Sequence, residues 1–333
     1  MPGITGVERS MVNMINIALT MGDPAGIGPE IIVRILAQNK WRDRARFIVY
    51  GAPDIIEFNR EKFAPQTEFE VNATADLTMK DITPGVASAL GGRAAYDTIS
   101  LATLDAIAGK VDAVVTAPMN KLAVNLAGIP FTGHTERIAE LCGVKDFAMM
   151  QSAGNLRVAF VTTHIPLAQV PGACTRRRIE IVTKLLAQAC REENIPNPRL
   201  AAAAINPHAG ENGWMGREDE DTVKPALAEL RAGNINIDGP FPPDTLFIEN
   251  VRNKYDGIVS MYHDQGHIPF KMLAFDRGVN STLGLPIIRT SPDHGTAYEI
   301  AYQGKADLGS MTAAVDLALT RAEHRRKCRM NNG

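Results

Sequence analysis

The chain has 333 residues, of which 45% are hydrophobic and 22% charged, and its formal net charge is −2. This balance provides no basic surface for nucleic acid, no apolar stretch reaches membrane-spanning length, and the four cysteines show neither metal nor disulfide spacing. We therefore expect a globular cytoplasmic protein with one or two α/β domains.

The first elements of the chain can be read in order from their apolar patterns. Residues 1–13 have no signal-peptide apolar core or cleavage pattern, which indicates a disordered leader or an upstream start. A strand is predicted over Ile15–Thr20, then the glycine-rich segment 22–30, then a helix from Ile31 to about Gln38. The glycine spacing fits neither a Rossmann fingerprint nor a Walker A loop. A tight turn and a close approach to a ligand therefore remain equally good interpretations of this segment.

Further along, strands are predicted over Phe47–Gly51 and Asp112–Thr116, on either side of a long amphipathic helix that begins near Ser88. Residues 131–136 begin another helix, for which Thr135 is a plausible N-cap, and helix N-termini favour anions. The last part of the chain is predicted to be helical.

Three strand-like apolar runs in the middle of the chain each lead into a histidine: His164, His208 and His263. Helical stretches separate the runs, so we predict parallel strands in βα units, whose ligands bind beyond the carboxyl ends. A single histidine after a strand is more often a loop residue or a buried polar group. Three together favour a divalent-metal site, because three imidazoles leave a coordination position open for substrate.

Other polar residues lie in glycine-rich segments without helical or strand periodicity. A phosphate-class group would suit five of them: His134, Thr135, Lys271, Asn280 and Arg289. Two carboxylates, Asp244 and Asp264, could orient a ligating imidazole or move a proton, or could equally be turn residues. Taken singly, each of these side chains is more often a surface charge or a turn residue.

From Ile15 to about Ala318, the chain resembles the 4-hydroxythreonine-4-phosphate dehydrogenase (PdxA) family. The resemblance is carried by MGDPAGIGPE, TGHTE, TTHIPL, INPHAGENG, PPDTLF, MYHDQG, RGVNSTLGLPIIRTSPDHGTA and GKAD. It implies a two-domain α/β/α fold like that of isocitrate and isopropylmalate dehydrogenases, with the active site in the interdomain cleft. We expect the first domain to comprise residues 14–130 and about 280–330, and the second, with the histidines, about 131–279.

The resemblance also implies roles for particular residues. The metal ligands fall on His164, His208 and His263, and the substrate contacts on the five anion-binding candidates. The cofactor-binding loop falls on Ser291, Asp293, His294, Gly295 and Thr296. It further implies a homodimer in which the third histidine is contributed across the interface, and one divalent metal, zinc or magnesium, manganese or cobalt.

The implied reaction is oxidation of a 3-hydroxyl by NAD, with NADP as a possible substitute, followed by loss of CO2. Asp244 is our candidate proton acceptor, with a metal-bound hydroxide as its rival, and Lys271 is a second catalytic candidate. The segment His267-Ile268-Pro269 is more similar to a catabolic branch acting on 4-phospho-D-threonate or 4-phospho-D-erythronate.

Several alternatives stay open at this point. Within the family, these are the dehydrogenase of pyridoxal phosphate biosynthesis and a terephthalate dihydrodiol dehydrogenase, whose substrate carries no phosphate. Outside it, the same histidines would suit a zinc hydrolase or lyase, which would not bind NAD. A sensor that binds a ligand without turnover also fits an α/β fold.

Overall fold

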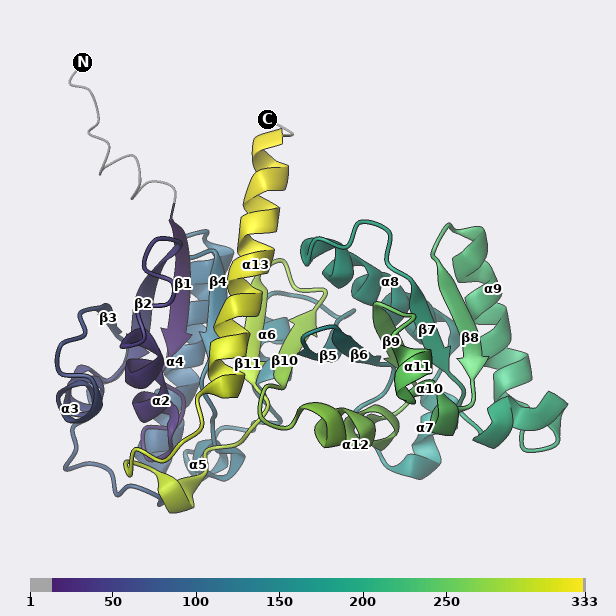
Figure 1. Cartoon of the computed structure of the whole chain (residues 1–333). Coiled ribbons are helices and arrows are strands. Elements are labelled where there is room, and N and C mark those ends of the chain that lie inside the picture. Colours follow the sequence, from purple (N-terminus) through teal and green to yellow (C-terminus); the bar gives the residue numbers. More distant parts are fainter. Residues whose placement is uncertain (1–13, 332–333) are drawn as a thin grey trace. The chain divides into compact units, whose positions relative to one another are not determined.

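The computed structural model describes residues 14–331 (Figure 1), so the leader predicted for residues 1–13 lies outside the described residues. The chain divides into two compact units. Among the described residues, unit 1 comprises 14–143 together with 286–331, and unit 2 is Val144–Leu285. Both units are built from strands and helices, which confirms the predicted α/β class.

Unit 1 is built on parallel strands in the order β3-β2-β1-β4-β11. These strands are β1 (Ile15–Thr20), β2 (Ala45–Gly51), β3 (Glu70–Ala73), β4 (Ala113–Thr116) and β11 (Ile288–Pro292). Strands β1 and β4 are almost wholly buried, as their continuous apolar runs predict for a parallel sheet covered on both faces.

The helices of unit 1 connect and cover these strands. They are α2 (Gly28–Leu36), α3 (Pro53–Phe63), α4 (Ala89–Ile107), α5 (Lys121–Leu126), α6 (His134–Leu141) and α13 (Gly309–Asn331), with the 3₁₀ turn η4 (Tyr298–Ile300). The C-terminal helix α13, yellow in Figure 1, packs against β11, β4 and β1. Buried Met311, Val315 and Leu319 form its apolar contact face.

Unit 2 has the strand order β10-β5-β6-β9-β7-β8. These strands are β5 (Ala148–Ala153), β6 (Leu156–Phe160), β7 (Leu200–Ala203), β8 (Ile237–Phe241), β9 (Gly257–Ser260) and β10 (Val279–Leu283). Strands β6, β9, β7 and β8 are mutually parallel, whereas β5 is antiparallel to both β10 and β6. The predicted histidine-bearing strands are therefore confirmed as parallel neighbours.

The helical segments of unit 2 pack on the faces of these strands and follow their ends. They are η1 (Leu167–Gln169), α7 (Val170–Ala173), α8 (Arg176–Glu192), η2 (Pro207–Gly213), η3 (Asp219–Val223), α9 (Lys224–Ala232), α10 (Pro243–Leu246), α11 (Glu249–Arg252) and α12 (His263–Ala274). One apolar cluster joins the strands to α8 and α9, and another joins them to α12. The strands of this unit are thus covered on both faces.

Most elements expected from the sequence are present, and their ends differ slightly. The helix predicted to begin near Ser88 is α4, and the Ser88 side chain caps it by accepting a hydrogen bond from the Gly91 backbone N–H. The N-cap assigned to Thr135 is wrong: α6 begins at His134 and its N-cap is Gly133. None of the helices within 14–331 combines the length and the apolar character that crossing a membrane requires.

The unit boundaries lie some residues away from those expected at 130/131 and 279/280. Helix α6 belongs to unit 1 because it packs on α4, where the Arg137 guanidinium lies 4.7 Å from the Tyr96 ring centroid. Strand β10 belongs to unit 2 because it pairs with β5 along its whole length.

Candidate functional site

Two of the predicted metal ligands, His164 and His263, share a pocket of about 340 Å³ in unit 2. The pocket lies where β6 and β9 end, and the centroids of the two imidazole rings are 5.6 Å apart. Its remaining lining comprises Thr163, Ile165, Leu167, Val170, Tyr262 and Asp264. A concave, mostly apolar wall with a few convergent polar groups is typical of a small-molecule site.

The His263 ring is held from its edge and from one face. Its Nδ1 lies 2.6 Å from Oδ1 of Asp264, which leaves Nε2 as the nitrogen available to a cation. The His267 ring stacks on it with centroids 4.0 Å apart, and Phe160 stacks on His267 at 4.7 Å. Burial, followed by the charges of His263 and Lys271, lowers the pKa of His267 to about 3, so this imidazole is neutral near pH 7.

His208 lies in a turn of unusual backbone conformation. Residues 208–212 of η2 all have positive φ, four of them without being glycine, and each costs about 1–2 kcal/mol in this left-handed region. The buried Asp219 carboxylate holds the entry to the turn by accepting the backbone N–H groups of Ile205 at 2.8 Å and Asn206 at 3.0 Å. Strained backbone of this kind gathers at functional sites.

The histidine arrangement fits a divalent cation in part. Two exposed or half-buried imidazoles lie together with a carboxylate that orients one of them, which is a common donor set for zinc and its neighbours. Within residues 14–331, however, no three His, Cys, Asp or Glu side chains are grouped so that they could hold a metal ion. One chain as described therefore supplies an incomplete set, and His208 does not join the pair.

The other candidates in unit 2 lie on neighbouring elements. Lys271 is on α12, two helical turns beyond His263, and its ammonium lies 5.8 Å from the Phe275 ring centroid. Asn280 is half-buried on β10, directly opposite Gln151 on β5. Asp244 is exposed on α10, a helix that packs against the turn carrying His208.

In unit 1, Arg289 is a buried cation on β11 with 3% of its surface exposed. Its guanidinium donates a hydrogen bond of 2.8 Å to Oγ1 of Thr116 on the adjacent β4. Burial lowers the pKa of Arg289 to about 10, and the charge of Glu136 opposes this shift. The group is still charged near pH 7 and is suited to binding an anion.

His134 begins α6 and is electrostatically coupled to Arg289, and Thr135 follows it in the first turn. Burial, followed by the positive charges of Arg289 and Lys121, lowers the pKa of His134 to about 3, while a hydrogen bond to the Ala117 backbone opposes the shift. Its Nε2 is buried without a hydrogen-bond partner among the described residues. A neutral imidazole with one unpaired nitrogen is suited to a hydroxyl or another polar ligand group.

Of the predicted cofactor-loop residues, Ser291 lies within β11, whereas Asp293, His294, Gly295 and Thr296 follow the strand, and the loop contacts the glycine-rich segment 22–30. The Asp293 backbone N–H donates to the Ser310 hydroxyl at 3.0 Å, and the Thr296 carbonyl accepts from the Ile27 N–H at 3.0 Å. A Cβ on Gly28 would lie 2.2 Å from the Met21 carbonyl oxygen. At this position the protein's own backbone requires glycine, which supports the tight-turn interpretation.

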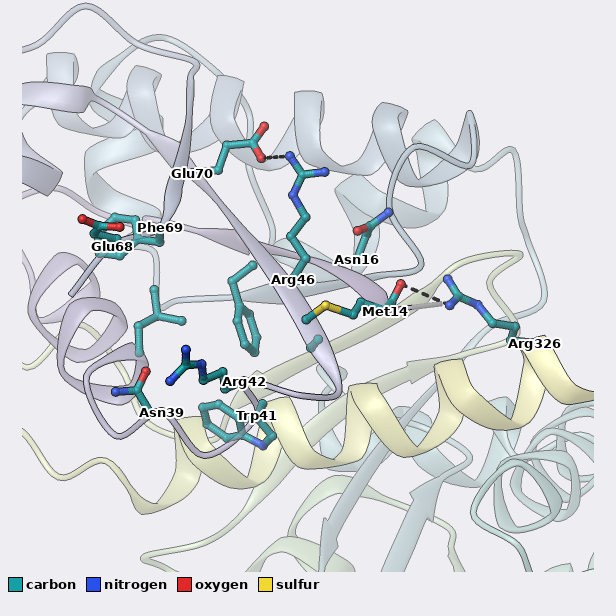
Figure 2. Close-up of a pocket in the computed structure, with 13 residues that line it drawn as sticks. Met14, Asn16, Asn39, Trp41, Arg42, Arg46, Glu68, Phe69, Glu70 and Arg326 are labelled. Atoms are coloured by element: carbon teal, nitrogen blue, oxygen red, sulfur yellow. Dashed lines mark hydrogen bonds and ion pairs between the residues drawn. The ribbon is translucent and has the colours of Figure 1, made fainter. Parts of the chain in front are cut away.

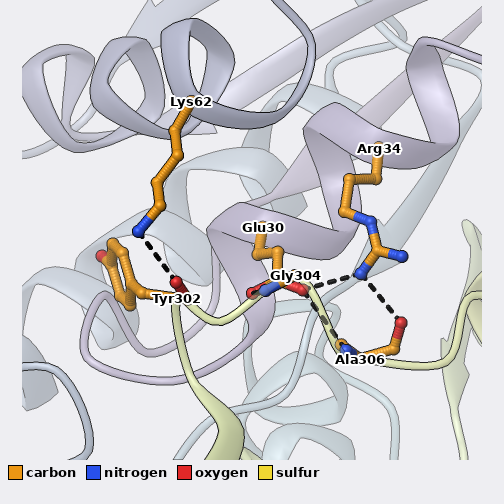
Figure 3. Close-up of polar contacts among 6 residues, drawn as sticks. All are labelled: Glu30, Arg34, Lys62, Tyr302, Gly304 and Ala306. Atoms are coloured by element: carbon orange, nitrogen blue, oxygen red, sulfur yellow. Dashed lines mark hydrogen bonds and ion pairs between the residues drawn. The ribbon is translucent and has the colours of Figure 1, made fainter.

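Glu30 on α2 anchors the segment after this loop, as Figure 3 shows. Its buried carboxylate accepts the backbone N–H groups of Gly304 at 3.1 Å and Ala306 at 3.3 Å, and pairs with Arg34 at 2.7 Å. Lys62 donates to the Tyr302 carbonyl at 3.0 Å. The loop residues of unit 1 are therefore held in place by buried polar contacts.

A cavity of about 690 Å³ in unit 1 lies at the other ends of the strands (Figure 2). It is lined by Met14 and Asn16 near the start of β1, and by Ala45, Arg46 and Phe47 in the first half of β2. An ion pair between Arg46 and Glu70 crosses its wall. Since ligands of parallel α/β sheets bind at the carboxyl ends of the strands, this cavity is not the candidate catalytic site.

Some supporting residues were not predicted from the sequence. Gln265 accepts the Met261 backbone N–H at 2.7 Å and donates to the Ala204 carbonyl at 2.6 Å, which ties the ends of β9 and β7 together. Asp219 and His267 were likewise not predicted to act at the site. The only sequence signal for Gln265 and His267 is their place close to the candidate ligand His263, and Asp219 carries no such signal, because an acidic residue in the polar segment after His208 has the same pattern whether it is buried or exposed.

Comparison with known proteins identifies close relatives over most of the chain. A sequence model of the family described as "Pyridoxal phosphate biosynthetic protein PdxA" matches residues 33–318. A D-threonate 4-phosphate dehydrogenase from Pectobacterium atrosepticum is 40% identical over 91% of this chain and 98% of its own length. A 4-hydroxythreonine-4-phosphate dehydrogenase from Desulforapulum autotrophicum is also 40% identical, over 92% of this chain and 95% of its own.

Solved structures show the same relationship. The crystal structure of a 4-hydroxythreonine-4-phosphate dehydrogenase from Klebsiella pneumoniae matches with a TM-score of 0.79 and 40% identity, covering 92% of this chain and 99% of that one. An isocitrate dehydrogenase from Methylococcus capsulatus, 14% identical with a TM-score of 0.51 over 95% of this chain and 89% of that one, shares the fold alone. The expected likeness to that fold is confirmed.

Proposed function

The chain belongs to the PdxA family of dehydrogenases, and from that premise we propose that it oxidises the 3-hydroxyl of a phosphorylated four-carbon hydroxy acid and then releases CO2. The proposed substrate is of the 4-phospho-D-threonate or 4-phospho-D-erythronate type, and NAD accepts the hydride. The observation that carries the proposal is the pair of imidazoles, His164 and His263, in one pocket at the ends of parallel strands. The relatives' names support the substrate class.

The second candidate substrate is 4-hydroxythreonine 4-phosphate. It is favoured by relatives of that name which are as similar to this chain as the threonate enzymes, at 40% identity in each case. The segment His267-Ile268-Pro269 favours the threonate branch. Both substrates carry a phosphate, a hydroxyl and a neighbouring polar group, so the same residues would bind either one.

We propose that His164, His208 and His263 hold a divalent cation, one of the three being supplied by a second copy of the chain. The incomplete donor set of one chain supports this arrangement. The exposed face of α12 also supports it, because Ile268 and Met272 of this helix and its C-cap Phe275 are 59%, 82% and 73% exposed. Contiguous exposed apolar side chains are typical of an interface.

The remaining residues act on the substrate by charge and by hydrogen bonding. Arg289 and Lys271 bind its anionic groups, the guanidinium through a forked geometry and the ammonium as a point charge. Asn280 and Thr135 add hydrogen bonds. His134, neutral near pH 7, accepts a hydrogen bond from a hydroxyl at its unpaired Nε2 when its other nitrogen carries the proton.

Asp244 is the proposed proton acceptor for the 3-hydroxyl, because α10 places it beside the turn of His208. When bound, a divalent cation supplies Lewis-acid polarisation of the reacting oxygen and of the oxygen on which charge develops as CO2 leaves. NAD supplies the redox chemistry, and residues Ser291 to Thr296 position it. Asp264 keeps the His263 ring in the tautomer that presents Nε2.

The proposal is tested by an NAD-reduction assay with added divalent metal. The substrate panel comprises 4-phospho-D-threonate, 4-phospho-D-erythronate, 4-hydroxythreonine 4-phosphate and an unphosphorylated cis-dihydrodiol. We expect turnover of the first two, its loss on chelation and its return with metal. Full activity after exhaustive chelation, with metal analysis showing none bound, would refute the metal site. Failure to bind NAD in a fluorescence titration would favour a zinc hydrolase instead.

A further inference from the structure

Three stacked aromatic rings form a column that begins with His263 in the wall of its pocket and continues through His267 to Phe160. Phe160, at the end of β6, stacks on His267 with ring centroids 4.7 Å apart and planes 18° apart. His267 in turn stacks on His263 with centroids 4.0 Å and planes 24° apart. Face-to-face rings cannot share a cation between them, so His267 is not an additional ligand beside His263 in this arrangement.

His267 is placed for this contact by helical spacing. It lies four residues after His263 on α12 and four before Lys271, so the three side chains follow one face of the helix. The adjacent Gly266 allows the helix to lie close to the strands, because a Cβ there would lie 2.7 Å from both Cε1 of Phe160 and Oγ of Ser260.

The His267 ring contributes through its faces and not through hydrogen bonds of its own. Only 7% of the residue is exposed, and neither ring nitrogen has a hydrogen-bond partner among the described residues. Burying polar atoms without partners is unfavourable. The contact that accounts for this position is the stack between Phe160 and His263.

We propose that His267 is a positioning residue that fixes the ring orientation of His263 for cation binding. Two rotatable bonds orient the His263 imidazole, and Asp264 restrains only its edge at Nδ1. The stacked face removes the remaining rotation, so that Nε2 is presented in one direction before the cation arrives. This inference rests on the proposed metal site but concerns a residue outside the ligand set.

The test measures binding of Co²⁺ and Zn²⁺ to the full-length protein by competition with a chromophoric chelator. His267→Leu removes the aromatic face, and we expect the affinity for both ions to fall about 10- to 100-fold, as for other groups that orient ligands. The visible d–d absorption bands of bound Co²⁺ should shift, since ligand geometry changes. His267→Phe keeps an aromatic face and should retain the affinity within about threefold.

Phe270→Leu is the matched control, because Phe270 is buried on the same helix and shares an apolar cluster with Phe160 but does not stack on His267 or His263. It should lose thermal stability while binding Co²⁺ like the wild type. Equal losses of affinity in Phe270→Leu and His267→Leu would reduce the effect to general packing and overturn the inference.

Two further outcomes overturn the positioning role: wild-type affinity in His267→Leu, or a loss in His267→Phe as large as that in His267→Leu. If instead the wild-type protein binds neither ion, the proposed metal site fails and the inference fails with it. The wild-type measurement therefore distinguishes failure of the proposed function from failure of the inference alone.

Discussion

The polar residues of unit 1 and the candidate ligands of unit 2 differ in how strongly the surrounding chain buries them and holds them in place. In unit 1, the candidate Arg289 and the anchoring residue Glu30 are buried, with 3% and 0% of their surfaces exposed, and both hydrogen-bond to other segments of the chain. In unit 2, His164 and His208 are exposed, and no three His, Cys, Asp or Glu side chains within residues 14–331 are grouped so that they could hold a metal ion. Contacts within the chain therefore hold the polar groups of unit 1 in place, whereas the proposed metal ligands of unit 2 would be held together only by a bound cation. The two kinds of site should respond differently to substitution.

The largest effect is expected from His164→Ala in unit 2. Loss of a metal ligand should lower metal affinity and NAD reduction by about 100-fold or more, while the melting temperature of the metal-free protein changes by less than about 2 °C because the side chain is exposed. Metal analysis, activity and thermal unfolding measure the three quantities. His324→Ala on α13 is the control and should leave all three unchanged. Wild-type metal content in His164→Ala would show that His164 is not a ligand.

Arg289→Ala tests the buried cation of unit 1. If Arg289 contacts an anionic group of the substrate, the loss in kcat/KM should correspond to about 2–5 kcal/mol. The affinity for the metal should be unchanged, which would distinguish the role of Arg289 from that of the proposed metal ligands in unit 2. Arg289→Lys keeps the charge but not the forked geometry, and should recover only part of the loss. Unaltered kcat and KM in Arg289→Ala would remove this residue from the substrate site.

Glu30→Gln tests whether the Glu30 carboxylate anchors the segment after the predicted cofactor loop. Its carboxylate accepts two backbone N–H groups and pairs with Arg34, so we expect the free energy of unfolding to fall by about 2–3 kcal/mol and the KM for NAD to rise. Urea unfolding and steady-state kinetics measure these changes. Glu57→Gln, which breaks a pair on the surface of α3, should cost less than about 1 kcal/mol. Equal effects from both would deny the anchoring role of Glu30.

The smallest effect concerns the pH dependence of stability. The pKa of His134 is about 3 in the folded chain and near 6.5 when unfolded, so the unfolded chain binds the extra proton between these values. The stability that neutral His134 contributes is complete above about pH 6.5 and is lost as the pH falls toward 3. His134→Gln should therefore reduce the loss of unfolding free energy between pH 7.5 and pH 5 by about 1–2 kcal/mol. An unchanged loss of unfolding free energy at acid pH in His134→Gln would contradict the lowered pKa of His134.

The sequence predicted the elements whose signals are local. Continuous apolar runs located β1, β4 and the three histidine-bearing strands, because burial on both faces of a parallel sheet leaves that pattern. The amphipathic pattern placed the beginning of α4 near Ser88, where the structure has it. The N-cap of α6 was wrongly predicted as Thr135. The N-cap is Gly133, which has no side chain to signal the position.

The supporting contacts could not be predicted from the sequence because they join residues distant in the chain. Asp219 holds the turn before His208, and Glu30 holds Gly304 and Ala306 across most of the sequence. A carboxylate in a helix has the same pattern whether it faces solvent or a buried backbone N–H. Only folding makes that distinction.

The amino-acid sequence by itself determined the α/β class, the family, and the three histidines that follow parallel strands. Apolar periodicity and residue identity are properties of the sequence and do not depend on how distant segments pack. The tertiary structure decided which of those histidines lie together, that His267 stacks beneath His263, and that His134 is held neutral near pH 7. These properties depend on distance and burial, which arise only when segments remote in the chain pack against one another.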